Sequence, residues 1–265
     1  MSAGTTPPGA SDERQASEWV RRMFANIAPR YDFLNHLLSF NIDRGWRKVL
    51  MNRLQPVLSQ PGAKILDLCC GTGDVLLDLQ SISATRVLGA DFCHEMLVSA
   101  YRKAHHRGFD APLIEADALQ LPFAAATLDA ISISFGFRNL ANYSAGLREF
   151  NRVLKPGGVL AILEFSHPPG RVTRAAYGFY SRVVLPALGS MVSGSREAYA
   201  YLPESIRKFP QPEELCAMMA AAGFTQTSFE FLTRGIAALH IGLKLLPRSI
   251  RQGPMDILAQ PEIAN

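Results

Sequence analysis

Short apolar runs that alternate with helical segments are the feature that most restricts how this chain of 265 residues can fold. Each run has the length of a buried strand, and apolar residues recur at helical spacing between the runs. This rhythm is typical of a parallel sheet with helices on both of its faces. The runs are AKILDL (63–68), RVLGAD (86–91), APLIEA (111–116), LDAISISF (128–135) and GVLAILEF (158–165).

The C-terminal part of the chain predicts the rest of the sheet. A helix is expected to begin after Asn142 as its N-cap, and a later one at Pro212, a residue suited to a first helical turn. Two further strand candidates follow, TQTSFEFLT (225–233) and GIAALHIGL (235–243). We therefore predict an α/β fold with one doubly wound, Rossmann-like sheet, mostly parallel with an antiparallel C-terminal strand.

The domain organisation predicted from composition is a single domain over residues 18–245. Residues 1–17 are rich in Pro, Gly, Ser and Thr and predict a disordered tail, and residues 246–265 predict a flexible one. Within the domain, residues 18–60 predict an N-terminal helical cap. Residues 171–205 combine aromatic, aliphatic and arginine side chains, which suits a lid for an apolar tail and, almost equally, a helix pair with a solvated basic face.

Cysteine usage and hydropathy bear on where the protein works. The four cysteines form neither a disulfide framework nor a CxxC pair, which predicts a reducing compartment, the cytoplasm. There is no signal-peptide pattern and no run of roughly 18 apolar residues, so the chain is not expected to cross a membrane. Its net charge of +4 favours anionic surfaces, and solvated Lys and Arg side chains are the alternative explanation of that charge.

A loop with two glycines, CCGTGD, follows the first predicted strand. Gly71 and Gly73 allow a sharp turn and a close approach of a ligand to the backbone. A dinucleotide fingerprint would need a third glycine or a small residue where Leu76 stands, and no phosphate-binding Gly-Lys-Ser/Thr follows. The charge of Asp74 at the helix start is expected to repel a pyrophosphate. The loop therefore predicts a ligand without phosphates.

Two acids after the next strands indicate what that ligand is. Asp91 ends the second predicted strand, where a carboxylate accepts hydrogen bonds from both hydroxyls of a ribose. Asp117 follows the third, where its carboxylate or the Ala118 amide can contact an adenine edge. A ribose and an adenine without phosphates point to S-adenosylmethionine (SAM).

The ordered motifs also carry a family resemblance. LDLCCGTGD, GADF, EADALQLPF and RVLKPGGVLAILEFS resemble those of class I SAM-dependent methyltransferases, and YDFLNHLLSFNIDRGWR, SISFGFRNL, YAYLPESIRKFP and RGIAALHIG resemble the quinone-biosynthesis C-methyltransferases. The resemblance covers residues 20–243. Phe137 is a small departure, because the family more often has Ile or Leu there.

The resemblance implies methyl transfer from SAM to a ring carbon of a reduced, prenylated quinol. Demethylmenaquinol is the favoured acceptor, and a benzoquinol of ubiquinone biosynthesis is the alternative. The donor's methyl group is already activated, so the chemistry calls for alignment and a phenolate, and no metal. The six histidines show no metal-ligand spacing. Because quinols with polyprenyl tails reside in membranes, the resemblance also implies transient attachment at the inner face of the membrane. A homo-oligomer or a complex with other enzymes of quinone biosynthesis is left open, and no nucleic-acid partner is expected.

The residues expected to act on substrate follow the fourth strand. Arg138 is predicted to stabilise the developing oxyanion and Asn139 to orient the hydroxyl, unless Arg138 only buttresses its loop. Tyr31 is a further candidate for ring contact or proton transfer, or for packing alone. The residues expected to hold SAM are Asp67, Gly71, Thr72, Gly73, Asp91, Asp117, Ala118 and Ser134.

Three rival functions share part of this pattern. A methyltransferase acting on RNA or on another small molecule predicts an NPPY-type loop or an extra domain, and the corresponding loop here reads SFGFRN. A noncatalytic SAM-binding partner in a quinone-synthesis complex would lose Arg138 and Asn139, which are present. A nicotinamide dehydrogenase is disfavoured by Leu76 and by the lack of a Tyr-x-x-x-Lys pair.

Overall fold

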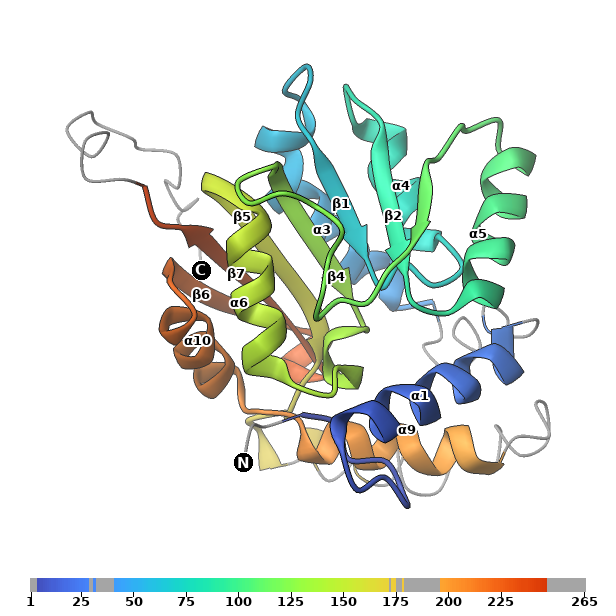
Figure 1. The fold of residues 1–265 in the computed structure, drawn as a ribbon. Coiled ribbons are helices and arrows are strands. Elements are labelled where there is room, and N and C mark those ends of the chain that lie inside the picture. Colours follow the sequence, from blue (N-terminus) through green and yellow to red (C-terminus); the bar gives the residue numbers. More distant parts are fainter. Residues whose placement is uncertain are drawn as a thin grey trace.

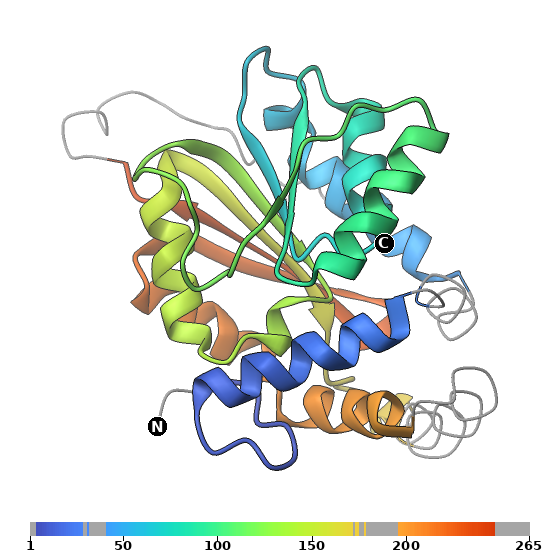
Figure 2. The ribbon, with the colours of Figure 1, turned by 45° about the vertical axis from the view of Figure 1, so that its right-hand side comes forward.

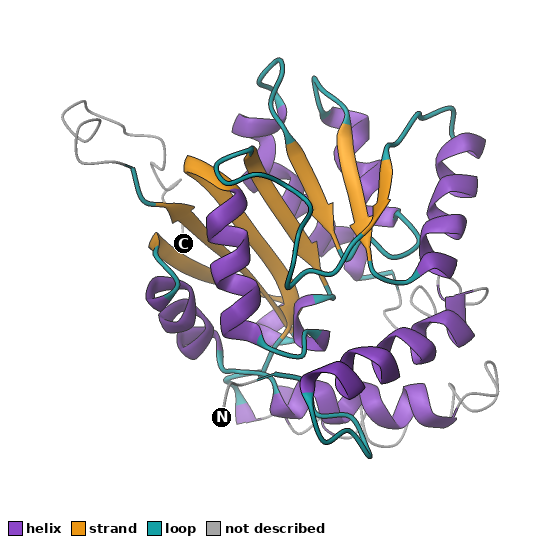
Figure 3. Ribbon diagram, in the orientation of Figure 1, coloured by secondary structure: helices purple, strands orange, loops and turns teal. Residues whose placement is uncertain are grey.

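The computed structural model describes residues 4–28, 31, 41–171, 173–174, 178 and 196–246. Its strands form one seven-stranded sheet in the order β3-β2-β1-β4-β5-β7-β6 (Figures 1 and 3). β7 is antiparallel to both of its neighbours, and the other pairs are parallel. The mostly parallel, doubly wound sheet is thus confirmed. The strands are β1 (Ile65–Leu68), β2 (Val87–Asp91), β3 (Leu113–Glu115), β4 (Leu128–Ser134), β5 (Leu154–Phe165), β6 (Phe224–Leu232) and β7 (Ala237–Lys244).

Two helix layers cover the sheet because its central strands are apolar on both faces. All four residues of β1 are buried, Ile65 in the core under one layer and Leu66 in the core under the other. The first layer contains α3 (Asp43–Leu58), α4 (Asp74–Ile82) and α5 (His94–His106), and the second contains α6 (Tyr143–Val153) and α10 (Pro212–Ala221).

The helical cap differs from the prediction. α1 (Glu13–Ile27) lies beyond the carboxyl ends of β1, β2 and β4, and α9 (Arg196–Lys208) lies against it (Figures 1 and 2). The ring of Trp19 in α1 lies 5.1 Å from that of Tyr201 in α9. By contrast, α3 packs on the sheet face, since its residues Leu50 and Leu54 belong to the same core as Ile65. Residues 43–58 are therefore a layer helix, and the assignment of all of 18–60 to the cap was wrong.

The N-terminal segment is ordered where the sequence predicts a disordered tail. α1 begins at Glu13, with Asp12 as its N-cap, and the backbone N–H of Thr5 donates to the carbonyl of Leu140 at 2.8 Å. The predicted disorder is therefore wrong for residues 4–17. Composition shows only that this segment has low hydrophobicity, and these contacts compensate for it. Residues 1–3, 32–40, 247–265 and most of the predicted lid over 171–205 lie outside the described residues.

No helix among the described residues has both the length and the apolar character needed to span a bilayer.

Candidate active site

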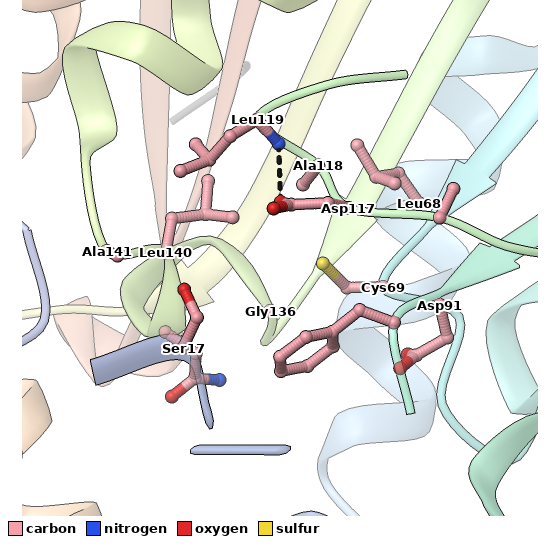
Figure 4. A pocket seen from close by; sticks show the side chains of 13 residues that line it. Ser17, Leu68, Cys69, Asp91, Asp117, Ala118, Leu119, Gly136, Leu140 and Ala141 are labelled. Carbon is pink, nitrogen blue, oxygen red and sulfur yellow. Dashed lines mark hydrogen bonds between the residues drawn. The ribbon is translucent and has the colours of Figure 1, made fainter. Parts of the chain in front are cut away.

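A pocket lies at the carboxyl ends of β1, β2 and β4, between the strand ends and α1 (Figure 4). It brings together residues that follow four different strands, as expected for a ligand site in a doubly wound sheet. Of the residues predicted to form the site, Asp91, Asp117, Ala118 and Asn139 line it. Ser17 of α1 lines it too, although the sequence assigned that residue to a tail.

The charge of the pocket suits a cationic or neutral ligand. Its described lining residues include two acids, Asp91 and Asp117, and neither Lys nor Arg. Phosphate groups would meet only negative charge there, whereas a sulfonium or an ammonium group would be attracted. The residues present therefore fit SAM better than a nucleotide cofactor.

The loop after β1 turns sharply into α4. Cys69, Gly71 and Gly73 all have left-handed backbone conformations, with φ of 56°, 54° and 86°. Gly73 is also the N-cap of α4, so the backbone at the helix start is not shielded by a side chain. Glycine adopts both conformations without strain, and a Cβ added to Gly73 would lie 3.1 Å from Ala100 Cβ.

Asp91 anchors this loop. Its Oδ2 accepts a hydrogen bond from the Gly71 N–H at 2.9 Å, and its Oδ1 accepts one from the Cys93 N–H at 2.9 Å. Burial raises the pKa of Asp91 to about 6, against the hydrogen bonds that lower it. Asp91 lines the pocket and is 6% exposed, and its contact with a ribose stays a prediction.

The missing third glycine has a packing explanation. Leu76 is fully buried, and a Cβ added to Gly89 of β2 would lie 2.7 Å from its Cδ2 atom. The close approach of helix and strand that a third glycine provides in a dinucleotide fingerprint occurs here through a glycine on the neighbouring strand. Leu76 therefore fills the space beneath the loop.

Asp74 does not act as the free negative charge that the sequence analysis assumed. Its Oδ1 lies 2.6 Å from Lys103 Nζ, and its Oδ2 lies 3.0 Å from Arg47 Nη1. Burial raises the pKa of Asp74, but its bonds to these two cations outweigh burial and lower it. Because the charge is neutralised, the exclusion of phosphates depends on the acids in the pocket instead. Lys103 also donates to Thr72 Oγ1 at 3.2 Å, so that hydroxyl is held behind the loop.

Asp67 and Ser134 lie deeper than the pocket. Asp67 is 1% exposed, its Oδ1 accepts from Ser132 Oγ at 2.5 Å, and burial raises its pKa to about 7. Asp67 Oδ2 and Ser134 Oγ are buried and make no hydrogen bond of ordinary geometry with any described residue. Neither residue is among those that line the pocket. Their contact with SAM stays a prediction.

Asp117 turns toward its own backbone. Its Oδ1 accepts a hydrogen bond from the Leu119 N–H at 2.8 Å, the dashed line in Figure 4. This local turn fixes the strand-end loop and directs the adjoining Ala118 into the pocket wall. Both residues thus line the pocket, and their contact with adenine stays a prediction.

Arg138 is part of a buried ion pair. Its Nη1 donates to Glu164 Oε1 at 2.8 Å and also to the carbonyl of Phe135, and its backbone N–H donates to Glu164 Oε2 at 3.2 Å. The guanidinium lies over the Phe165 ring, 5.4 Å from its centroid. The side chain of Arg138 is 7% exposed and holds its loop. Its action on the oxyanion stays a prediction.

Tyr31 reaches the glycine loop from the cap. A Cβ added to Gly71 would lie 3.8 Å from Tyr31 Cε1, and the ring packs edge-on against Phe24 at 6.0 Å. The structure therefore brings Tyr31 to the loop, and its contact with the acceptor ring stays a prediction. Sequence reasoning missed Thr5 and Tyr201, and for Tyr201 the signal was its place in the quoted motif YAYLPESIRKFP.

We expect SAM affinity to depend on pH through Asp91. The ribose hydroxyls donate to the ionised carboxylate, so affinity should be constant at neutral and higher pH. The affinity for SAM should fall as the pH drops through about 6, and the loss should approach tenfold for each pH unit. Calorimetry between pH 5 and 8 measures this. Asp91→Asn should bind more weakly by roughly 1–3 kcal/mol at neutral pH and with a flatter profile.

The matched control is Asp110→Asn, because Asp110 is exposed and pairs with Arg86 on the surface. It should reproduce the wild-type profile. An Asp91→Asn variant with the same affinity and the same pH profile as the wild type would remove Asp91 from the ribose site.

Comparisons with known proteins identify the family of this chain. The family model described as "ubiE/COQ5 methyltransferase family" matches residues 10–244. A demethylmenaquinone methyltransferase of Thermus thermophilus is 50% identical over 83% of this chain and 99% of its own. A ubiquinone/menaquinone biosynthesis C-methyltransferase of Geobacter sulfurreducens is 41% identical over 87% of this chain and 90% of its own.

Solved structures confirm the fold. A SAM-dependent methyltransferase from Aquifex aeolicus superposes with a TM-score of 0.56 at 18% identity, covering 83% of this chain and 97% of its own. The family match covers nearly all of the described residues of this chain. The chain belongs to the ubiE/COQ5 methyltransferase family and is a SAM-dependent methyltransferase.

Proposed function

We propose that this protein transfers a methyl group from SAM to a ring carbon of a reduced, prenylated quinol, converting demethylmenaquinol to menaquinol. The relative that is 50% identical carries the name demethylmenaquinone methyltransferase. The observation that carries the proposal is the acidic pocket, which adjoins a loop that offers Asn139 and the buried Arg138–Glu164 pair. Such a site combines attraction for a cationic donor with groups suited to a phenolate.

The reaction requires little covalent chemistry from the protein itself. SAM supplies a methyl group that is already activated by its sulfonium. The protein's residues have to align the acceptor carbon with that methyl group and favour the phenolate form of the quinol, which makes the adjoining carbon nucleophilic. Asn139 lines the pocket, and α1 and α9 cover the strand ends and limit the entry of water.

The direct test supplies methyl-labelled SAM and reduced acceptors in an anaerobic assay. We expect label on a ring carbon of demethylmenaquinol, located by mass spectrometry and NMR, and none on the oxidised quinone, which lacks the nucleophile. Label on oxygen would contradict carbon transfer. The absence of transfer to every quinol, with SAM binding intact, would favour the noncatalytic rival.

A benzoquinol acceptor is the second candidate. The name of the Geobacter sulfurreducens relative covers both ubiquinone and menaquinone biosynthesis. Supplying equal concentrations of the two demethylated quinols in one assay compares kcat/KM directly. A preference for the naphthoquinol supports the first proposal, and a preference for the benzoquinol replaces it.

Such an acceptor carries a polyprenyl tail, so we propose that the protein works in the cytoplasm with transient docking on the inner face of the membrane. Its pI near 9.0 supports attraction to anionic lipid. Sedimentation with anionic vesicles at low salt should carry the protein down, and neutral vesicles should not. Protein that stays in solution with both would count against docking.

A further inference from the structure

A chain of hydrogen bonds runs from the N-terminal segment to the pocket. Thr5 Oγ1 lies 2.6 Å from Tyr201 Oη, and Tyr201 Oη lies 3.0 Å from Asn139 Oδ1. Asn139 Nδ2 then donates to the carbonyl of Phe135 at 3.4 Å. Thr5 and Tyr201 are 7% and 6% exposed, so water competes little for these groups. The chain joins residues 196 positions apart.

The direction of each bond follows from the groups themselves. An amide oxygen only accepts, so Tyr201 donates its single hydroxyl proton to Asn139. Tyr201 Oη must then accept from Thr5, whose hydroxyl becomes the donor. Burial raises the pKa of Tyr201, which keeps this hydroxyl protonated.

The orientation of the Asn139 amide is fixed as a result. Its oxygen is engaged by Tyr201, and one of its N–H groups is engaged by the Phe135 carbonyl. The donor that this pocket-lining amide has left to offer a ligand is therefore its second N–H. A flipped amide would instead turn its carbonyl oxygen toward Phe135, where two acceptors would oppose each other.

We propose that Thr5 and Tyr201 are positioning residues, which hold the Asn139 amide so that it donates a hydrogen bond to the oxygen of the methyl acceptor. This rests on the proposed function, because that oxygen gains negative charge as the ring carbon becomes nucleophilic. A fixed N–H stabilises such a charge, and a carbonyl oxygen in its place repels it. The acceptor class is an electron-rich phenol.

The surroundings hold both positioning residues in place. The backbone N–H of Thr5 donates to the carbonyl of Leu140, the residue next to Asn139. The ring of Tyr201 packs on Trp19 of α1. The N-terminal segment and α9 therefore meet at one point of the site, and each depends on the other for its position.

Removing either hydroxyl tests the proposal. Tyr201→Phe should lower kcat by about tenfold, the effect of losing one hydrogen bond at a charged centre, while the dissociation constant of SAM stays unchanged. Thr5→Val should act in the same direction and more weakly. The matched controls are Tyr101→Phe, on an exposed residue, and Thr6→Val, whose hydroxyl contacts Lys208 on the surface.

Asn139→Asp distinguishes a hydrogen bond that the residue 139 side chain donates from one that it accepts. The carboxylate still accepts from Tyr201 but has no N–H to offer, so kcat should fall by about 10²-fold or more while SAM binding persists. Full activity of Asn139→Asp would overturn the donor role.

A readout that does not depend on turnover is the NMR signal of the Asn139 side-chain amide, assigned by its loss in Asn139→Asp. It should shift in Tyr201→Phe and in Thr5→Val and stay in place in both controls. An unmoved signal, or unchanged kcat in both hydroxyl variants, would overturn the positioning. If the wild type methylates no quinol, the proposed function fails, and the amide signal still decides the positioning.

Discussion

Arg138→Leu is expected to lower the free energy of unfolding by about 3–5 kcal/mol, the cost of leaving one partner of a buried ion pair alone. Glu164 is fully buried and loses its cation, and burial, which raises its pKa, is then unopposed by Arg138. Urea denaturation followed by circular dichroism measures the loss. Arg53→Leu is the matched control: it breaks a partly exposed pair with Glu230 and should cost about 1 kcal/mol or less.

The double variant Arg138→Leu/Glu164→Leu then separates structure from chemistry. Replacing both charges by apolar side chains should restore most of the lost stability. If the refolded double variant binds SAM but turns over about 10²-fold more slowly, Arg138 acts on the substrate's oxyanion as predicted. Normal turnover would instead make Arg138 a buttress of its loop. A double variant as unstable as Arg138→Leu would contradict the ion-pair explanation itself.

Gly136→Ala is expected to disrupt the pocket. An added Cβ would lie 2.3 Å from Cys69 Cβ and 2.9 Å from its sulfur, so two strand-end loops must move apart. Both residues line the pocket. We expect SAM affinity to fall by about tenfold or more, with a loss of stability of roughly 1–3 kcal/mol from overpacking. Calorimetry and thermal denaturation measure the two effects.

A compensating change checks the cause. Cys69→Gly removes the atoms that collide, and its backbone φ of 56° is one that glycine adopts without strain. Gly136→Ala/Cys69→Gly should therefore regain SAM affinity that Gly136→Ala loses. Gly45→Ala is the control, since an added Cβ there has no described atom within 4 Å. A double variant no better than Gly136→Ala would point to another cause.

Local signals in the sequence proved sufficient for the sheet and for helix ends. Asn142 caps α6 by accepting from the Ala145 N–H, and α10 begins at Pro212, both as predicted. The apolar runs became strands because a strand covered on both faces has to be apolar on both. These features depend on neighbouring residues, which the sequence displays directly.

Features that depend on distant contacts were not predictable in this way. The helical pattern of α3 has an apolar stripe but does not say which surface covers it, and Leu50 turned out to pack on the sheet. Thr5 is polar and lies in a segment of low hydrophobicity, so nothing local indicates its bond to Tyr201. Likewise, the charge of Asp74 was visible in the sequence, but its neutralisation by Lys103 and Arg47 was not.

The position of β7 between β5 and β6 has a consequence for the nascent chain. β5 and β6 leave the ribosome before β7, yet each of them pairs with β7 along that edge. Until Ala237–Lys244 emerges, both strands therefore present unpaired backbone groups to other chains. Synthesis that stalls in this interval would leave β5 and β6 unpaired along the edges that face β7, so we expect a chaperone to be most useful to this protein after β6 has emerged and before β7 has.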